Sequence, residues 1–163
     1  RQSAVEALRF SEGDPSWSAV VHLVNALPSI FGVASAALNL VCGDEVITRV
    51  QAGSSSTEAD DGERADMSEA AEGTATCTCP RAQSFCAYVL LPDPPAPVLV
   101  LDAREDRRFR DFPRVQSGEV VFYVGAPIVI KGFCVGTLCL QHSGSRELED
   151  WPTARLALLT SFA

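Results

Sequence analysis

The chain has 163 residues, of which 47% are hydrophobic and 21% are charged, and its formal net charge is −8 at pH 7. This composition is typical of one globular domain, and a domain of this size buries enough surface to fold without a metal ion or a disulfide. No apolar run reaches the roughly 18 residues of a membrane-spanning helix, and no basic patch indicates a nucleic acid. We therefore expect neither a membrane nor a nucleic acid as a partner.

The cysteines lack the regular spacing of a disulfide framework. They are Cys42, Cys77, Cys79, Cys86, Cys134 and Cys139. Four of them lie inside apolar runs, where cysteine packs as a small hydrophobic residue. Thiols without a disulfide framework are typical of a reducing compartment, so we expect a cytoplasmic location.

Most of the negative charge lies in one segment, residues 53–80. This segment contains seven acidic residues and one arginine, and it is rich in serine and alanine. Such a composition cannot offset the entropic cost of ordering the chain by burying apolar surface. The segment is therefore predicted to be an acidic, mobile loop inside a single domain that covers residues 1–163.

The first regular element is predicted to be a helix within residues 14–31. Asp14 is suited to cap it, and Pro15 fits its first turn. Apolar residues recur at helical spacing at Trp17, Val20, Val21, Val24 and Leu27. Pro28 is expected to end the helix.

Two strand-like runs follow, at residues 33–41 and 45–52. Gly43 takes the first central position of the turn between them, which favours an antiparallel hairpin. A third short strand is predicted within residues 96–103.

Asp102 closes that third strand, and Glu105 follows three residues later. This spacing matches a capping box and predicts a short helix over residues 104–112.

Two apolar runs at residues 120–130 and 133–141 flank Lys131-Gly132, which indicates a second hairpin. Because both runs are apolar on both faces, the sheet should be covered on both sides. Pro127 cannot donate a ladder hydrogen bond, so it is expected at a bulge or a strand entrance.

An apolar seam within residues 147–163 predicts a C-terminal helix that leads to a neighbouring domain. The order of the elements indicates an α+β fold with both terminal helices on one face of the sheet.

Five short motifs occur in order along the chain. They are Ser-Phe-Cys at 84–86, Asp-Ala at 102–103, Asp-x-Arg-Phe at 106–109, Phe-Tyr-x-Gly-Ala-Pro at 122–127 and Gly-Thr-Leu-Cys at 136–139. In this order they resemble a subgroup of the GAF domain family, over roughly residues 15–163 without the acidic loop. GAF domains are regulatory modules of histidine kinases, cyclic-nucleotide phosphodiesterases, diguanylate cyclases and transcription regulators.

The resemblance implies a central antiparallel sheet with the terminal helices on one face and a small-molecule pocket under short helices on the other. The Ser-Phe-Cys segment would be one of these helices. The predicted ligand-binding residues are Ser84, Phe85, Cys86, Tyr88, Asp102, Asp106, Phe109, Val115, Phe122, Tyr123, Thr137 and Cys139. The ligand and any cofactor stay unidentified.

Side chains alternate along a strand, and this alternation assigns faces to several of these residues. Phe122 and Tyr123 should point to opposite faces of the sheet. Thr137 and Cys139 should face the pocket, because that face then holds the hydroxyl, and Leu138 and Leu140 should face away from it.

Cys86 has three interpretations. Covalent attachment of a bilin is disfavoured, because the attachment cysteine is commonly followed by histidine and Ala87 follows here. A thiol enzyme resembling the free methionine sulfoxide reductases would need a low thiol pKa and a resolving partner. The favoured interpretation is that Cys86 packs in the wall of an apolar pocket to which Ser84 and Tyr88 add polar groups.

Two further clusters could suggest a binding site. Cys77 and Cys79 resemble half of a metal clip, but no further ligands lie nearby in sequence, so no metal site is predicted. The arginines of residues 104–114 are interleaved with acidic residues, which favours a self-paired surface over an anion site. The signature linked to cyclic-nucleotide binding in phosphodiesterase GAF domains is not recognisable.

The favoured function is a non-catalytic sensory or regulatory domain of a larger signalling protein, in which ligand binding shifts the terminal helices. A GAF domain with a filled pocket that serves dimerisation or scaffolding, and a thiol enzyme, are the alternatives. The terminal helices carry apolar residues off their main stripes, at Leu23, Leu158 and Ala163. This surplus predicts a weak homodimer with Leu23 and Leu158 near its centre.

Overall fold

The computed structural model describes residues 15–53 and 77–163. These residues form one six-stranded antiparallel sheet in the order β3-β2-β1-β6-β5-β4. The strands are β1 (Ser35–Cys42), β2 (Glu45–Ala52), β3 (Cys77–Pro80), β4 (Val98–Val100), β5 (Phe122–Ile130) and β6 (Phe133–His142). The predicted α+β fold is confirmed.

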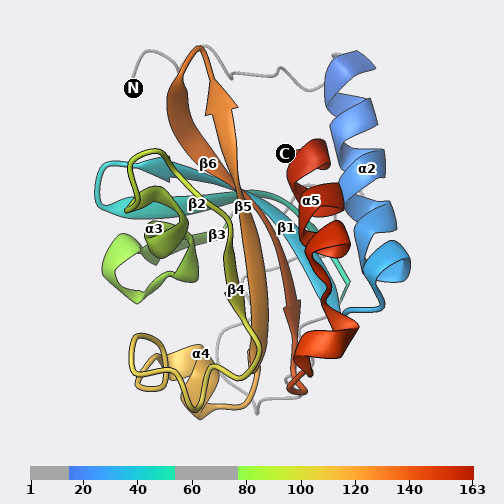
Figure 1. Ribbon diagram of the computed structural model, residues 1–163. Helices are drawn as coiled ribbons and strands as arrows, with labels where there is room; N and C mark the ends of the chain where they lie inside the picture. Colours follow the sequence, from blue (N-terminus) through green and yellow to red (C-terminus); the bar gives the residue numbers. More distant parts are fainter. Residues whose placement is uncertain (1–14, 54–76) are drawn as a thin grey trace, which may run out of the picture.

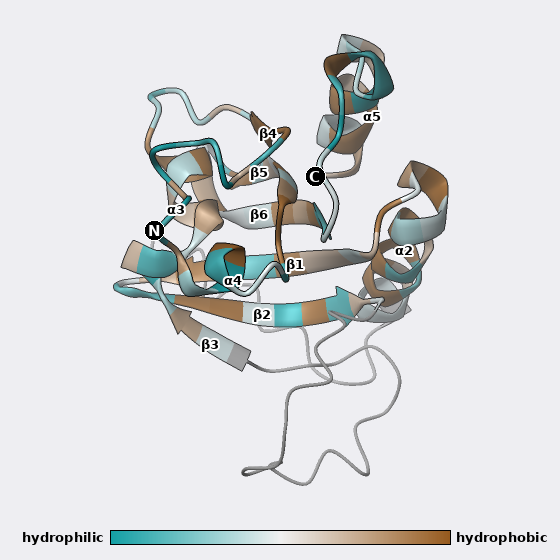
Figure 2. Cartoon of the chain, turned by 90° about the horizontal axis from the view of Figure 1, so that it is seen from below, coloured by the Kyte–Doolittle hydropathy of each residue, from teal (hydrophilic) through white to brown (hydrophobic). Residues whose placement is uncertain are grey.

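The helices lie in two layers, one on each face of the sheet. α2 (Pro15–Phe31) and α5 (Thr153–Phe162) cover one face, and α3 (Phe85–Leu90) and α4 (Pro113–Gln116) lie on the other (Figure 1). Figure 2 shows the same division from below, with the strands between the two pairs of helices. Two 3-10 turns, η1 (Arg81–Gln83) and η2 (Leu148–Asp150), precede α3 and α5. None of the helices in the described ranges combines the length and the apolar character of a membrane span.

Both predicted hairpins are present. Gly43, with a φ of 58°, lies in the two-residue turn between β1 and β2. Lys131 and Gly132 both have positive φ, 51° and 80°, between β5 and β6. Positive φ at both central positions is the requirement of a type I′ turn, whose twist matches that of the flanking strands.

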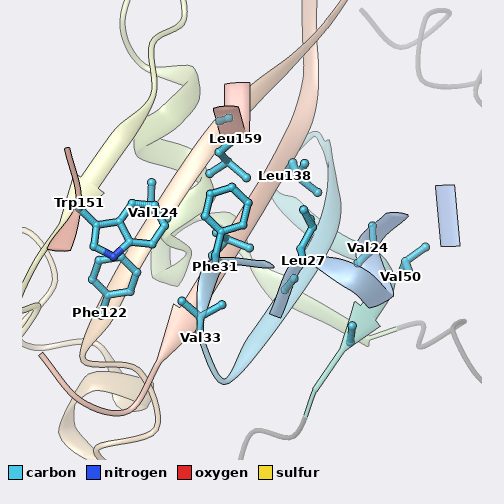
Figure 3. Close-up of a cluster of buried hydrophobic side chains, with 14 of the residues drawn as sticks. Val24, Leu27, Phe31, Val33, Val50, Phe122, Val124, Leu138, Trp151 and Leu159 are labelled. Carbon is cyan, nitrogen blue, oxygen red and sulfur yellow. The ribbon is translucent and has the colours of Figure 1, made fainter. Parts of the chain in front are cut away.

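The helix-face core joins both terminal helices to the sheet. Val24, Leu27 and Phe31 of α2 and Leu159 of α5 are buried against Leu138 and other inward-facing strand residues (Figure 3).

Trp151, between η2 and α5, completes this core. Its ring stacks on Phe31 with centroids 5.6 Å apart and lies 4.9 Å from the ring of Phe122. Trp151 therefore fastens the C-terminal segment both to α2 and to β5.

The alternation predicted for β5 and β6 is confirmed. Phe122 belongs to the helix-face core, whereas Tyr123 belongs to the core under α3 and α4. Leu138 and Leu140 likewise face the terminal helices, and Cys139 faces α3.

The prediction that Pro28 ends the first helix is wrong, because α2 continues to Phe31. Gly32, with a φ of 64°, and a hydrogen bond from Val33 N–H to Pro28 O at 3.0 Å close the helix instead. This is the Schellman arrangement, in which a left-handed glycine satisfies the last carbonyls. The proposed cap, Asp14, lies outside the described residues.

The helix predicted over residues 104–112 is absent, and the segment consists of turns up to α4. Asp102 accepts a hydrogen bond from the backbone N–H of Arg104, and Asp106 does the same with Arg108, each at 2.9 Å. A carboxylate that binds the backbone two residues ahead stabilises a turn rather than a helix.

Three other boundaries also differ from prediction. Residues 77–80, assigned to the acidic loop, form β3 and pair with β2, while residues 54–76 lie outside the described ranges. The C-terminal helix starts at Thr153 rather than at 147, after η2 and Pro152. Pro127 lies inside β5 rather than at its entrance, opposite Thr137 of β6 and just before the register shift between Ile128 and Val129.

Candidate functional site

A cavity of about 340 Å³ lies on the α3 and α4 side of the sheet. Its walls come from β1, β2 and β3, from η1 and the start of α3, and from α4 and the segment that leads to β5. The lining residues are Ser35, Ala37, Asn39, Val46, Thr48, Gln51, Cys79, Gln83, Ser84, Phe85, Cys86, Pro113, Arg114, Glu119, Tyr123 and Gln141. The cavity therefore combines an apolar wall with many hydrogen-bonding groups, as a binding site for a small polar molecule requires.

The Ser-Phe-Cys motif forms the start of α3. Ser84 caps the helix, because its side-chain oxygen accepts a hydrogen bond from the backbone N–H of Cys86 at 3.2 Å. The capped turn directs Phe85 and Cys86 toward the sheet, where both are buried. The capping serine and the two buried side chains thus explain why this segment folds as a short helix over the cavity.

Aromatic rings fill the space beside the cavity. Phe85 stacks on Phe109 at 4.5 Å and on Tyr123 at 4.7 Å between centroids, and Tyr88 meets Phe109 edge-on at 4.7 Å. Phe109 is fully buried by these contacts and by the guanidinium of Arg108 above it. This part of the predicted pocket is core rather than open space.

Two cysteine sulfurs meet at the floor of the cavity. Asn39 Nδ2 donates to Cys139 Sγ at 3.1 Å and to Cys86 Sγ at 3.4 Å. Thr48 Oγ1 donates to Asn39 Oδ1 at 2.8 Å, which fixes the orientation of the amide. Tyr123 OH donates to Cys86 Sγ at 3.7 Å.

These donors change the acidity of the thiols. A hydrogen bond with Cys139 is the main cause that lowers the pKa of Cys86 from 9.0 to about 6, against the opposing effect of burial. Smaller effects of Ser84 and Tyr123 act in the same direction as Cys139. The pKa of Cys139 is raised well above its ordinary value, because its proton is held in the hydrogen bond with Cys86 and because it is buried. Cys86 is therefore the thiol that ionises first.

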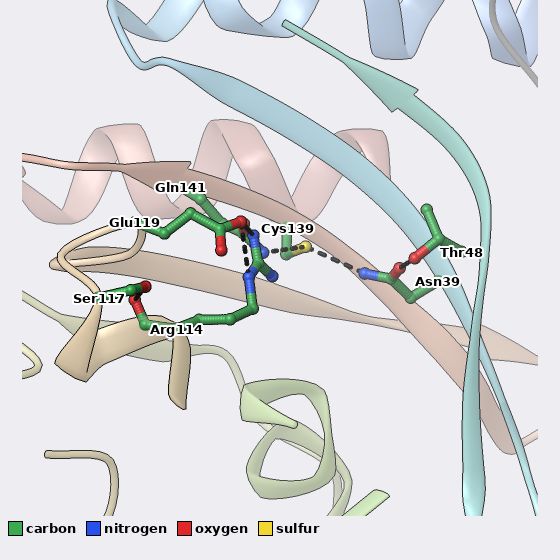
Figure 4. A network of polar contacts seen from close by, with 7 residues as sticks. All are labelled: Asn39, Thr48, Arg114, Ser117, Glu119, Cys139 and Gln141. Carbon is green, nitrogen blue, oxygen red and sulfur yellow. Dashed lines mark hydrogen bonds and ion pairs between the residues drawn. The ribbon is translucent and has the colours of Figure 1, made fainter. Parts of the chain in front are cut away.

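The guanidinium of Arg114 also lines the cavity and is part of a polar network (Figure 4). Arg114 of α4 donates from Nε to Glu119 Oε1 at 2.8 Å and from Nη2 to Gln141 Oε1 at 2.8 Å. Gln141 Nε2 in turn lies 3.8 Å from Cys139 Sγ. One polar network thus runs from Glu119 through the guanidinium to the cysteine pair.

The structure brings only part of the predicted site together. Ser84, Phe85, Cys86 and Tyr123 line the cavity. Cys139 lies beneath the lining, bonded to it through Asn39, and Thr137 is the strand partner of Asn39.

The other predicted residues do not line the cavity. Phe109 and Val115 are core, Tyr88 packs on Phe109, and Asp102 and Asp106 pair with Arg104 and Arg108 at 2.6 and 2.7 Å. The assignment of Phe122 is wrong, because its side chain points to the opposite face and packs on Trp151.

Sequence reasoning missed most of the polar residues in the cavity lining. Asn39 is the one amide in the apolar run of β1, and Gln141 similarly ends the apolar run of β6. A lone polar side chain in an otherwise buried strand was a usable signal, because burial requires a partner. Arg114 belongs to the arginines predicted to pair at the surface, whereas it pairs with Glu119 and lines the cavity.

No cluster of three histidine, cysteine or acidic side chains that could hold a metal occurs among residues 15–53 and 77–163. Cys79, one of the two cysteines considered for a metal clip, lines the cavity instead.

The sequence matches the GAF domain family over residues 19–163. The chain belongs to the GAF domain family. No curated protein matches the sequence. Solved structures with the same fold include the GAF domain of a phosphoenolpyruvate-protein phosphotransferase from Acinetobacter, with 14% identity, a TM-score of 0.57, and coverage of 88% of this chain and 75% of that one.

A free methionine-R-sulfoxide reductase from Neisseria meningitidis, in complex with its substrate, is similar to this GAF domain at 17% identity with a TM-score of 0.57. The match covers 99% of this chain and 82% of that one. The GAF-B domain of DevS from Mycobacterium smegmatis is similar at 16% identity and a TM-score of 0.55, over 89% and 85% of the two chains. At these identities the likeness shows the fold alone.

Proposed function

We propose that this GAF domain is a non-catalytic sensory or regulatory module that binds a small polar molecule in the cavity between α3, α4 and the sheet. The observation that carries the proposal is the polar lining of that 340 Å³ cavity, on the face opposite the terminal helices. A domain that served only as a scaffold would be expected to fill this space with its own side chains.

The charges and amides of the cavity indicate the chemistry of the ligand. Arg114 uses Nε and Nη2 for Glu119 and Gln141, and within the described residues its Nη1 has no protein acceptor. A guanidinium held in this way can bind a carboxylate or another oxygen acceptor of a ligand. The volume lies at the lower end of the range for ligand pockets, which favours a metabolite with a carboxylate or carbonyl group at one end.

A direct route leads from the cavity to the terminal helices. Tyr123 lines the cavity and contacts Phe85, while the next residue toward the strand start, Phe122, packs on Trp151 at the base of α5. A ligand that favours one position of β5 would therefore favour one packing of Trp151. Such a differential contact is what a population shift of the helices requires.

Thermal-shift titration with a panel of amino acids and small carboxylates tests the binding claim. A true ligand at about one hundred times its Kd stabilises the fold by about 2.7 kcal/mol, which for a domain of this size raises the Tm by roughly 5–10 °C. Gln51→Trp, which places an indole in the cavity from β2, should abolish the shift. Arg110→Ala, at an exposed position outside the lining, should preserve it. A shift that Gln51→Trp leaves intact would contradict the assignment of the cavity.

The thiol environment favours one second function, an enzyme that uses Cys86. Cys86 lines the cavity with a pKa lowered to about 6, and the fold is shared with free methionine-R-sulfoxide reductases. Repeated turnover of free methionine sulfoxide with a dithiol reductant, abolished by Cys86→Ser, would favour the enzyme. Absence of turnover together with ligand binding would favour the sensor.

A further inference from the structure

The two buried cysteines under the cavity share one hydrogen-bond donor. One amide nitrogen, Asn39 Nδ2, lies 3.4 Å from Cys86 Sγ and 3.1 Å from Cys139 Sγ and donates to both sulfurs. Both cysteines are free. Cys86 lies on α3 and Cys139 on β6, and these two elements pack directly on each other. Two reduced thiols, far apart in the sequence, are thus held side by side by the fold.

The pair is asymmetric with respect to the cavity. Cys86 lines the cavity, whereas Cys139 is fully buried behind it. A small molecule that enters the cavity therefore reaches the sulfur of Cys86 before that of Cys139. The surrounding donors, Tyr123 OH at 3.7 Å and Asn39 Nδ2 at 3.4 Å, stabilise negative charge on that sulfur. Thiolate character and access are the two properties that make a cysteine susceptible to oxidation.

We propose that Cys86 and Cys139 are a redox modification site, at which a small hydroperoxide that enters the cavity converts the two thiols into a disulfide. The inference rests on the geometry of the two sulfurs and does not depend on the ligand proposed above. It is also distinct from enzymatic turnover, because the product is the oxidised protein itself.

The chemistry proceeds in two balanced steps. The Cys86 thiolate attacks one peroxide oxygen, so that an S–O bond forms and the O–O bond breaks. The sulfur loses two electrons to the peroxide, and the other oxygen leaves with the former thiol proton as an alcohol or water. Cys139 sulfur then attacks the sulfenic sulfur of Cys86, an S–S bond forms, and the hydroxyl group leaves with the Cys139 proton as water. The S–S bond of about 2.05 Å requires the two sulfurs to approach each other across the Asn39 amide that both of them contact.

Tryptic mapping of the peroxide-treated full chain tests the proposal. Cys86 lies in the tryptic peptide 82–104, and Cys139 lies in the peptide 132–146, which also contains Cys134. Treatment of the reduced protein with hydrogen peroxide should lower its mass by two hydrogens and join these two peptides. Reduction with a dithiol should separate them again.

Two matched variants identify the sulfurs. Cys134→Ser should keep the cross-link, whereas Cys139→Ser should abolish it and should raise dimedone labelling of Cys86 at least tenfold over the wild type. If either variant fails to fold, the tryptic map of the oxidised wild-type protein decides the test by itself. Peptides 82–104 and 132–146 that stay separate while exposed Cys79 is oxidised would overturn the proposal, as would a cross-link that survives Cys139→Ser.

Discussion

Replacement of Trp151 by alanine should destabilise the domain by about 4 kcal/mol. Trp151 is buried, and its indole contacts both Phe31 at the end of α2 and Phe122 on β5. Truncation of a buried tryptophan costs roughly 3–5 kcal/mol, because burial energy is lost and a cavity is left. The substitution also removes the ring contacts with both Phe31 and Phe122, so the expected cost lies above the lower limit of that range. Such a loss is a large share of the roughly 5–15 kcal/mol that stabilises a typical domain.

Urea denaturation followed by far-UV circular dichroism measures this cost. With a slope of about 2 kcal/mol per molar urea, the midpoint should fall by about 2 M. Leu158→Ala is a control in the same C-terminal segment, because Leu158 is 43% exposed and its truncation should cost less than about 0.5 kcal/mol. If Trp151→Ala costs no more than Leu158→Ala, α5 is not fastened to the sheet as described, and the proposed route from Tyr123 to the helices fails.

Three further predictions concern the sheet, the charged turns and association. Gly136→Ala should destabilise the fold by about 3 kcal/mol or more, because a Cβ would lie 2.1 Å from the backbone oxygen of Asn39 on β1; Gly144→Ala, where the nearest atom is 3.5 Å away, should leave the Tm unchanged. The hydrogen bond with Arg108 lowers the pKa of Asp106. The stability that the ionised carboxylate contributes is therefore fully present above the unfolded pKa of 3.8 and is lost as pH falls through the folded pKa. Asp106→Asn should remove this pH dependence of the free energy of unfolding below pH 4, which amounts to no more than about 0.5 kcal/mol because the pair is partly exposed. The weak homodimer predicted from the sequence should appear in sedimentation at tens of micromolar and vanish in Leu158→Glu with folding intact, and a monomer at millimolar concentration would contradict it.

The sequence predicted those features of the fold that depend on local patterns. Gly43 and Gly132 identified both hairpins, since glycine reaches positive φ without a steric penalty. Strand alternation correctly separated Phe122 from Tyr123. The motif resemblance supplied the family and the helical Ser-Phe-Cys segment. The errors at Pro28 and at residues 104–112 arose where a Schellman closure and two aspartate-stabilised turns replaced the expected local signals.

The candidate site was less predictable because it depends on strand register. Asn39 reaches both cysteines only because β1 pairs with β6 so that Asn39 faces Thr137. No pattern near Cys86 in the sequence points to Cys139. The neighbourhood of Cys86 and Cys139 is therefore a product of tertiary structure alone.

Native mass spectrometry of the protein purified from its own host is the most direct test of the central claim, that the cavity holds a small molecule. The account predicts a bound small molecule on the wild-type protein that is absent from the Gln51→Trp variant, with both proteins folded. A wild-type protein that carries no ligand, or a ligand that the Gln51→Trp variant retains, would contradict it.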